Sequence, residues 1–94
     1  MVLIHGIPGA RAVWEGVAED LAADHRVLVP DLLGFGESPR PSAIGELWAD
    51  AQARALHEAL VERGVARAVF AGHNFGGLVA LALARRPGAE RLVA

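Results

Sequence analysis

Residues 69–84 read VFAGHNFGGLVALALA, in which a short apolar run of strand type passes within a few residues into a longer run of helical composition. A strand that turns directly into a helix strains the residue at the centre of the turn and needs small neighbours, so that the helix can approach the strand. The central residue here is Asn74, one of the few non-glycine residue types that tolerate positive φ. Three glycines supply the small neighbours: Gly72, Gly76 and Gly77. The sequence therefore predicts a strand over 67–71, a sharp turn at Asn74 and a helix over 74–86.

The rest of the chain alternates short apolar runs with longer amphipathic stretches. Short apolar runs predict buried strands, and apolar residues at three- and four-residue steps predict one face of a helix. The predicted strands are 2–4, 27–29, 67–71 and 90–94. Two further helices are predicted from the stripes Val13, Trp14, Val17, Leu21 and Ile44, Leu47, Trp48, Ala51, Ala55, the second of them capped by Ser42 and stopped by Gly64.

This alternation predicts the α/β class, with a doubly wound, mostly parallel sheet of about four strands and three helices. We expect Ile4, Leu28 and Val69 to be buried in adjacent strands. A chain of 94 residues is long enough for one compact domain. In sheets of this kind ligands bind beyond the carboxyl ends of the strands, which is where a site is expected.

Composition and charge argue against several classes of function. The formal net charge of −2 and the pI near 6.0 give no electrostatic attraction for nucleic acid or anionic membranes. The chain has no cysteine, and its four histidines lack metal-ligand spacing, so we expect neither a disulfide nor a metal site. The longest nearly apolar stretch, 75–84, is about half as long as a membrane-spanning helix, and no secretory leader follows Met1. A cytoplasmic protein is the default expectation.

Two backbone amides are candidates for stabilising negative charge on a reacting oxygen. After the first strand, Gly6 permits a sharp turn that can hold the amide of Ile7 pointing toward a ligand. The amide of Phe75 lies at the start of the last predicted helix, where the helix dipole favours an anion. The preceding His5 is interpreted as a hydrogen-bonded structural histidine, and not as a catalytic one.

The second predicted strand, at 27–29, is followed by a loop whose residues 31–38 read DLLGFGES. A Gly-x-Gly pattern is also found in dinucleotide sites, where a glycine-rich turn opens directly into a helix. Pro39 stands where a third glycine is expected, and the loop does not lead at once into a helix. A nucleotide site is therefore disfavoured, and no cofactor is expected.

Together, and in this order, three segments resemble the α/β-hydrolase family. They are LIHGIPG at 3–9, VLVPDLLGFGESPRP at 27–41 and VFAGHNFGGLVALALA at 69–84. The resemblance implies that the strand at 1–5 lies between those at 26–30 and 67–71. It also implies that the turn at Asn74 is the family's nucleophile elbow, that the amides of Ile7 and Phe75 form the oxyanion hole, and that residues 1–94 are the N-terminal part of a single hydrolase domain.

The residues depart from the family's pattern at Asn74. The matching residue is usually Ser, or Asp in the dehalogenase and epoxide-hydrolase branches. A carboxamide has no ionisable proton for a histidine base to remove, so Asn74 is not an activated nucleophile. His25, His57 and Asp50 do not match the family's catalytic histidine and acid, which follow later in the chain. We therefore expect the isolated chain to be inactive.

Four interpretations stay open. The first is a hydrolase of small ester-like substrates, and the second is a dehalogenase- or epoxide-hydrolase-like enzyme in which Asn74 replaces Asp. Ile7 and Phe75 count against the dehalogenase version, because that branch usually has Asn and Trp at these positions. The third is a non-catalytic relative that binds a small-molecule ligand, and the fourth is a structural or assembly fragment. Self-association through the open edge of the strand at 91–94 is also expected.

Overall fold

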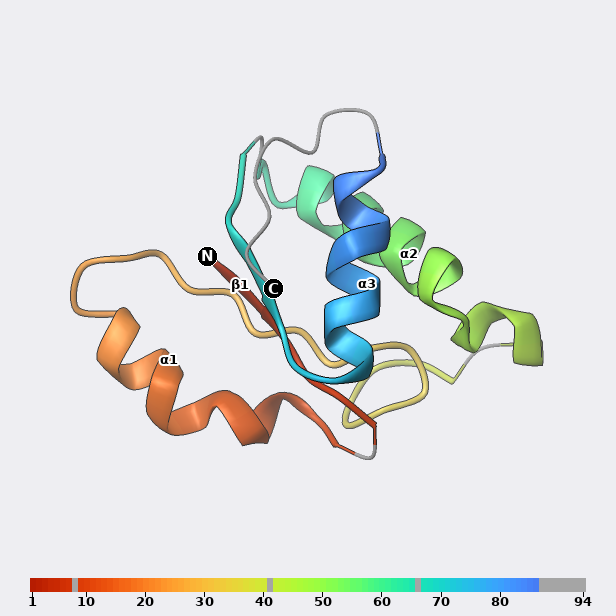
Figure 1. The fold of residues 1–94 in the computed structure, drawn as a ribbon, viewed down its shortest axis with the longest axis horizontal. Coiled ribbons are helices and arrows are strands. Elements are labelled where there is room, and N and C mark those ends of the chain that lie inside the picture. Colours follow the sequence, from red (N-terminus) through yellow and green to blue (C-terminus); the bar gives the residue numbers. More distant parts are fainter. Residues whose placement is uncertain (8, 41, 66, 87–94) are drawn as a thin grey trace.

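The computed structural model describes the chain except for residues 8, 41, 66 and 87–94, and Figure 1 shows its arrangement. The α-helices and strands are β1 (Val2–Ile4), α1 (Glu15–Leu21), α2 (Ala49–Glu62), β2 (Phe70–Gly72) and α3 (Phe75–Ala84). Two short 3₁₀ helices precede α1 and α2: η1 (Arg11–Trp14) and η2 (Ile44–Leu47). The strand predicted at 90–94, with its open edge, lies outside the described residues.

β1 lies in the middle of the sheet. It pairs in parallel with β2 on one side, and on the other side Val2 forms a parallel bridge with Leu28. The amide of Leu28 donates to the carbonyl of Met1, and the carbonyl of Leu28 accepts from the amide of Leu3, each at 2.9 Å. The predicted strand order is therefore confirmed, although the strand predicted at 27–29 is reduced to this single bridge.

Burial in the sheet falls off from the middle outward. Ile4 is fully buried, whereas Leu28 and Val69 are only partly buried, so the predicted burial holds fully for the central strand alone. The physical reason is that β1 has a hydrogen-bonded neighbour on each side, while each flanking segment has one among the described residues. The strand predicted to begin at residue 67 begins at Phe70 instead.

Helices lie on both sides of the sheet. α2 and α3 lie together on one side of the strands and α1 lies on the other, so the sheet is doubly wound as predicted (Figure 1). α3 packs against both strands and against α2. The largest buried apolar side chains of the core come from the strands, α2, α3 and the 31–38 loop: Val2, Ile4, Leu32, Leu56, Leu60, Phe70, Val79 and Leu83.

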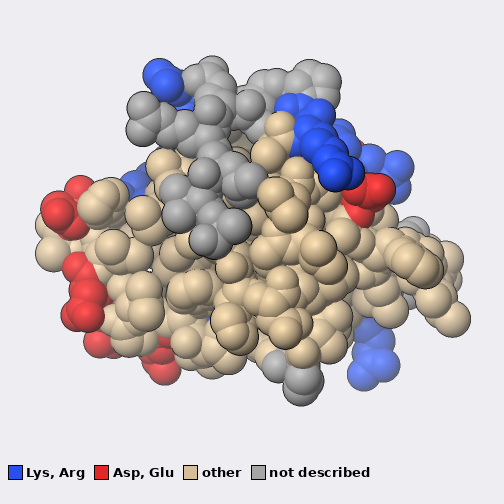
Figure 2. Space-filling model, viewed as in Figure 1, with Lys and Arg blue, Asp and Glu red and all other residues tan. Residues whose placement is uncertain are grey.

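The two predicted helical stripes are not the buried faces. Val13 of η1 and Val17 of α1 are both exposed, and Figure 2 shows acidic side chains gathered at the same end of the molecule. Ile44 and Trp48 are 81% and 70% exposed. Trp48 has extended backbone (φ −68°, ψ 154°), which separates η2 from α2, so a stripe drawn along one continuous helix loses its phase there. The buried face of α2 consists of Gln52, Ala53, Leu56 and Leu60.

Of the two signals predicted for the ends of this helix, a cap at Ser42 and a stop at Gly64, the structure confirms the second. Ser42 does not cap the helix, because the N-cap residue of α2 is Trp48 and no side chain caps it. Gly64 stops the helix with φ +74°, as predicted. The amide of Val65 donates to the carbonyl of Leu60, and the amide of Gly64 to that of Val61, which is the Schellman pattern of a glycine-ended helix.

Two glycines, Gly16 and Gly64, allow the effect of backbone conformation on stability to be measured without a steric clash. A methyl group on Gly16, in α1, or on Gly64 would meet no atom within 4 Å, but only Gly64 has positive φ. We expect Gly16→Ala to raise the free energy of unfolding by about 0.5–1 kcal/mol and Gly64→Ala to lower it by about 1 kcal/mol or more. Urea unfolding of both variants checks this, and a change of the same sign in both would contradict it.

Candidate functional site

The turn between β2 and α3 has the strained geometry that its sequence predicts. Asn74 has φ +58° and ψ −123° and is the one non-glycine residue with positive φ in the part of the chain that the structure describes. A methyl group on Gly72 would lie 2.2 Å from the carbonyl oxygen of Gly76, and one on Gly76 would lie 2.2 Å from that of Ile4. Both positions therefore need glycine. Gly77 does not, because its nearest contact would be an ordinary 3.7 Å.

The first amide of α3 is already hydrogen-bonded. The side-chain oxygen Oδ1 of Asn74 accepts from the amide of Phe75 at 2.8 Å. The next two amides, of Gly76 and Gly77, donate to the carbonyls of His73 and Asn74 at 2.9 Å each. The amide of Phe75, which the sequence indicates as an oxyanion donor, thus has the Asn74 carboxamide as its partner.

The structure brings the loop after β1 against this turn. A methyl group on Gly6 would lie 2.7 Å from Cβ of Asn74 and 2.8 Å from the carbonyl oxygen of His73. Ile7, the next residue, is 45% exposed. Gly6 and Asn74 therefore lie against each other. The amide of Ile7 directly follows Gly6 in the chain, and the amide of Phe75 directly follows Asn74. Both segments stand at the carboxyl ends of neighbouring parallel strands.

His5 is a buried structural residue, as predicted. Its ring nitrogen Nε2 accepts from the amide of Leu32 at 3.0 Å, so the hydrogen of the neutral ring is on Nδ1 and is donated to the carbonyl of Gly6 at 2.9 Å. The ring also stands edge-on to Phe35, with centroids 5.5 Å apart. Since both nitrogens are used inside the protein, His5 has no free group for a substrate.

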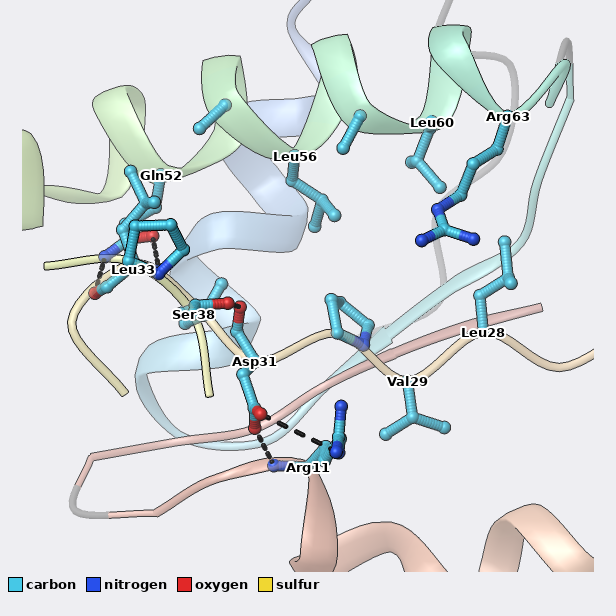
Figure 3. A pocket seen from close by; sticks show the side chains of 15 residues that line it. Arg11, Leu28, Val29, Asp31, Leu33, Ser38, Gln52, Leu56, Leu60 and Arg63 are labelled. Carbon is cyan, nitrogen blue, oxygen red and sulfur yellow. Dashed lines mark hydrogen bonds and ion pairs between the residues drawn. The ribbon is translucent and has the colours of Figure 1, made fainter. Parts of the chain in front are cut away.

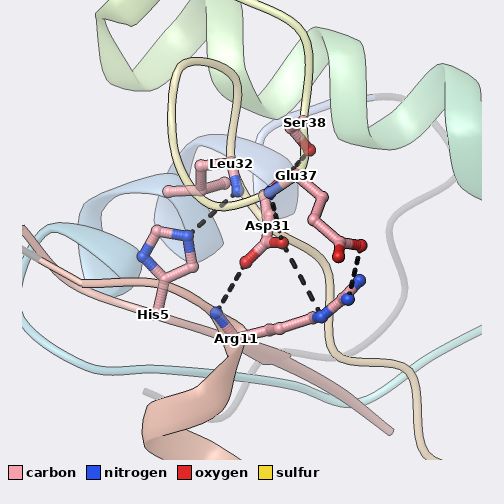
Figure 4. Close-up of polar contacts among 6 residues, drawn as sticks. All are labelled: His5, Arg11, Asp31, Leu32, Glu37 and Ser38. Carbon is pink, nitrogen blue, oxygen red and sulfur yellow. Dashed lines mark hydrogen bonds and ion pairs between the residues drawn. The ribbon is translucent and has the colours of Figure 1, made fainter.

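Asp31 is the centre of a polar cluster beside the loop after β1 (Figure 4). Its carboxylate accepts from the backbone amides of Arg11 at 2.7 Å and Glu37 at 3.0 Å. Burial acts to raise the pKa of this carboxyl, but the two backbone hydrogen bonds and the Arg11 guanidinium outweigh it, so the pKa lies below its ordinary value. The Arg11 guanidinium also bonds Glu37 at 2.7 Å on the exposed side.

The glycines of the 31–38 loop serve this cluster. Gly34 and Gly36 both have positive φ, at 86° and 53°. A methyl group on Gly36 would lie 2.3 Å from the Asp31 carboxylate. The Gly-x-Gly pattern is thus explained by turn geometry and by close approach to a carboxylate, which needs no nucleotide.

Gln52 is a structural residue that the sequence analysis missed. It is 1% exposed, and its amide makes two 2.9 Å hydrogen bonds to the backbone of Leu33, one to the amide and one to the carbonyl. These bonds fasten the 31–38 loop to α2. The only available signal was a polar residue between Ala51 and Ala53, which does not distinguish a buried glutamine from a solvated one.

A cavity of about 460 Å³ lies between α2 and residues 28–33 (Figure 3). Its walls are mostly apolar, with Gln52 and Leu33 toward one end and Leu28 and Arg63 toward the other. The turn at Asn74 does not line this cavity. The cavity and the turn are therefore separate features of the protein.

Asp31 gives the protein a defined response to acid. Because its pKa is lowered in the folded state, it contributes stability that is complete above the unfolded-state pKa, near 3.9. That contribution is lost as the pH falls through the lower, folded-state pKa. We expect Asp31→Asn to lower the free energy of unfolding at pH 7 by about 1.5–3 kcal/mol and to flatten its dependence on pH in this window. Urea unfolding between pH 7 and pH 2.5 measures both.

The control for this prediction is Glu37→Gln. Glu37 bonds the same guanidinium, but its side chain is 79% exposed, so solvent screens the pair. We expect this variant to keep the stability and acid response of the unmodified chain. Equal losses in the two variants would show that the surface ion pair, and not the buried carboxylate, determines the effect.

A parallel sheet with helices on both faces and a strained strand-to-helix turn defines the α/β-hydrolase class of fold. A family model described as alpha/beta hydrolase fold matches residues 1–93, and the chain belongs to this family. The chain is 38% identical over 87 residues to Lipase 3 of Moraxella sp., covering 92% of the chain and 27% of that lipase. It is 30% identical over 84 residues to Epoxide hydrolase 4 of Mus musculus, covering 89% of the chain and 23% of that protein.

Solved structures give the same result. A thermophilic esterase from Thermogutta terrifontis superposes with a TM-score of 0.84 at 37% identity, over 90% of the chain and 31% of the esterase. The epoxide hydrolase CorEH superposes with a TM-score of 0.88 at 33% identity, over 97% of the chain and 32% of that protein. The chain thus spans about a quarter to a third of the length of these relatives.

The described residues lack two kinds of feature. None of the helices there is both long and apolar enough to cross a bilayer. Nor do those residues include a group of three or more His, Asp or Glu side chains that could hold a metal ion.

Proposed function

We propose that this chain is the part of an α/β-hydrolase that carries the oxyanion loop and the nucleophile elbow, in a protein that acts on small ester-like substrates. The observation that supports this most directly is the strained turn at Asn74, packed against the glycine loop that leads to Ile7. Amides on these two segments would stabilise the oxyanion of an acyl-transfer intermediate. The lipase and esterase relatives support an ester as the substrate class.

The residue at the nucleophile position gives this part no activity of its own. Asn74 offers neither a hydroxyl nor a carboxylate, and its side-chain oxygen occupies the amide of Phe75. The catalytic acid and histidine belong to the part of a hydrolase that follows these residues. The proposed role of the 94 residues is therefore to form half of a site.

A second candidate is an epoxide-hydrolase-like protein in which Asn74 replaces an Asp nucleophile. Asn has the shape of Asp, and the contact between its Oδ1 and the amide of Phe75 is one that a carboxylate oxygen would also make. The epoxide hydrolase relatives support this branch. A non-catalytic relative that binds a small ligand with the same segments is the alternative to both enzymes.

Two chimeras distinguish these candidates. The chain would replace the matching segment of the T. terrifontis esterase and, separately, of CorEH, so that the recipient supplies the rest of the site. Each chimera would carry Asn, Ser or Asp at position 74 and be assayed on esters and epoxides. Activity with Ser on esters supports the first candidate, and activity with Asp alone on epoxides supports the second. Folded chimeras that are inert with both residues would leave the ligand-binding alternative.

The isolated chain gives a simpler test. We expect no measurable ester hydrolysis, because the nucleophile is missing. We also expect self-association, because the sheet formed by the described residues is small and an unpaired strand edge recruits further strands. Light scattering together with a generic ester assay measures both. An active, stable monomer would contradict the proposal in both respects.

A further inference from the structure

The loop that carries Ile7 is fixed at both of its ends to one short segment of the chain (Figure 4). Before the loop, the ring of His5 accepts from the amide of Leu32 at 3.0 Å. After the loop, the amide of Arg11 donates to Oδ1 of Asp31 at 2.7 Å. Asp31 and Leu32 are neighbours in sequence, so the two attachments share one support. The stretch between them, residues 6–10, has Ile7 near its middle.

The support is itself held by further hydrogen bonds. The second carboxylate oxygen of Asp31 accepts from the amide of Glu37 at 3.0 Å, and its backbone carbonyl accepts from the hydroxyl of Ser38. Gly36 approaches the carboxylate so closely that a methyl group on it would lie 2.3 Å away, and the Asp31 side chain is 3% exposed. Gln52 holds the next part of the loop to α2. Because the carboxylate is held by these contacts, the backbone amide of Arg11 that it accepts from is held in place as well.

We propose that Asp31 is a positioning residue for the backbone amide of Ile7, and that it acts through the backbone amide of Arg11. This inference rests on the proposed function, in which the amide of Ile7 is an oxyanion donor. The guanidinium of Arg11 contributes little, because it is 51% exposed and its Nε lies 3.7 Å from the carboxylate. The short backbone bond fixes where the loop ends, and the His5 ring fixes where it begins.

The backbone bond can be removed without touching the carboxylate. Arg11 is the first residue of η1, a position at which proline is well accommodated. The preceding residue, Ala10, is extended (φ −158°, ψ 177°), as a residue before proline needs to be. Arg11→Pro therefore removes the N–H donor, and Arg11→Ala is the matched control that removes the guanidinium and keeps the donor.

The first experiment measures backbone ¹⁵N order parameters of the chain itself. We expect Ile7 to stay near the rigid value of about 0.85 in Arg11→Ala and to fall below about 0.6 in Arg11→Pro. Unchanged order parameters in Arg11→Pro would overturn the proposal. If Arg11→Pro does not fold, Asp31→Ala against Glu37→Ala makes the same comparison, because only the first of these removes the acceptor of the Arg11 amide.

The second experiment separates this inference from the proposed function. In the esterase chimera with Ser at position 74, we expect Arg11→Pro to lower kcat about tenfold relative to Arg11→Ala, a loss of about 1.4 kcal/mol, with KM nearly unchanged. A mobile Ile7 with unchanged kcat would show that Asp31 positions the loop but that Ile7 is no oxyanion donor, and the proposed role of that amide would fail. A mobile Ile7 with lower kcat supports both. A chimera without activity leaves the order parameters to decide the inference alone.

Discussion

Replacing Gly76 with alanine is expected to prevent the chain from folding, or to lower its free energy of unfolding by at least about 3 kcal/mol. The new methyl group would lie 2.2 Å from the carbonyl oxygen of Ile4 and 2.6 Å from that of His5. Both obstacles are backbone atoms, of the last residue of β1 and of the residue after it, which cannot rotate away as a flexible side chain can. Because a domain of this size has a total stability of roughly 5–15 kcal/mol, the loss is a large part of it. Circular dichroism and urea unfolding measure the result.

Gly77→Ala is the matched control for this substitution. Gly77 is the next residue of the same helical turn, but a methyl group there would lie 3.7 Å from the nearest atom, the carbonyl oxygen of Gly72. Alanine is a better helix former than glycine, so we expect this variant to be unchanged or more stable by up to about 1 kcal/mol. If both variants lost stability equally, α3 would not pack on β1 as described.

The contrast between these two glycines shows what the sequence could predict. The strand, the turn and the helix follow from local rules, since glycine spacing and Asn tolerance of positive φ act within a few residues. Those rules do not say which glycine of the Gly76-Gly77 pair faces the strand. That choice depends on the carbonyl of Ile4, more than 70 residues earlier in the chain.

The errors in the helical stripes have a related cause. Ile44 and Trp48 have the spacing of a helical face, but the chain leaves helical geometry at Trp48, so the phase restarts at Ala49. The new phase turns Gln52 inward, where the backbone of Leu33 satisfies its amide. A periodicity argument places polar residues outside, and only the partner's position shows that this one is satisfied inside.

The role of Asp31 was likewise not predictable from its own loop. DLLGFGES predicts a turn, and the structure bears out that prediction in the positive φ values of its two glycines. The amide that Asp31 holds belongs to Arg11, the first residue of η1, at the end of the loop that leaves the neighbouring strand. Local sequence therefore predicts the shape of the cluster but not its attachment to the segment that carries Ile7.

The hydrogen bond between Asn74 and Phe75 leads to the second large effect. In the esterase chimera, Asn74→Ser is expected to restore ester hydrolysis for two reasons. Serine supplies a hydroxyl whose proton a histidine base can remove, and the loss of Oδ1 frees the amide of Phe75 to bind the developing oxyanion. The measurement is kcat/KM on a short-chain ester, compared with the chimera that keeps Asn74.

Asn74→Ala separates these two reasons. Alanine also frees the amide of Phe75 but offers no nucleophile, so this variant contains the proposed oxyanion hole without the attacking group. Serine hydrolases lose on the order of 10⁴-fold or more in rate when the nucleophile is removed, and we expect the Ser variant to exceed the Ala variant by a factor of that order. Any activity of the Ala variant above that of the Asn74 chimera measures what the freed amide contributes. Equal rates for Ser and Ala, in folded proteins, would mean that the residue at position 74 is not the attacking group, and the esterase proposal would fall.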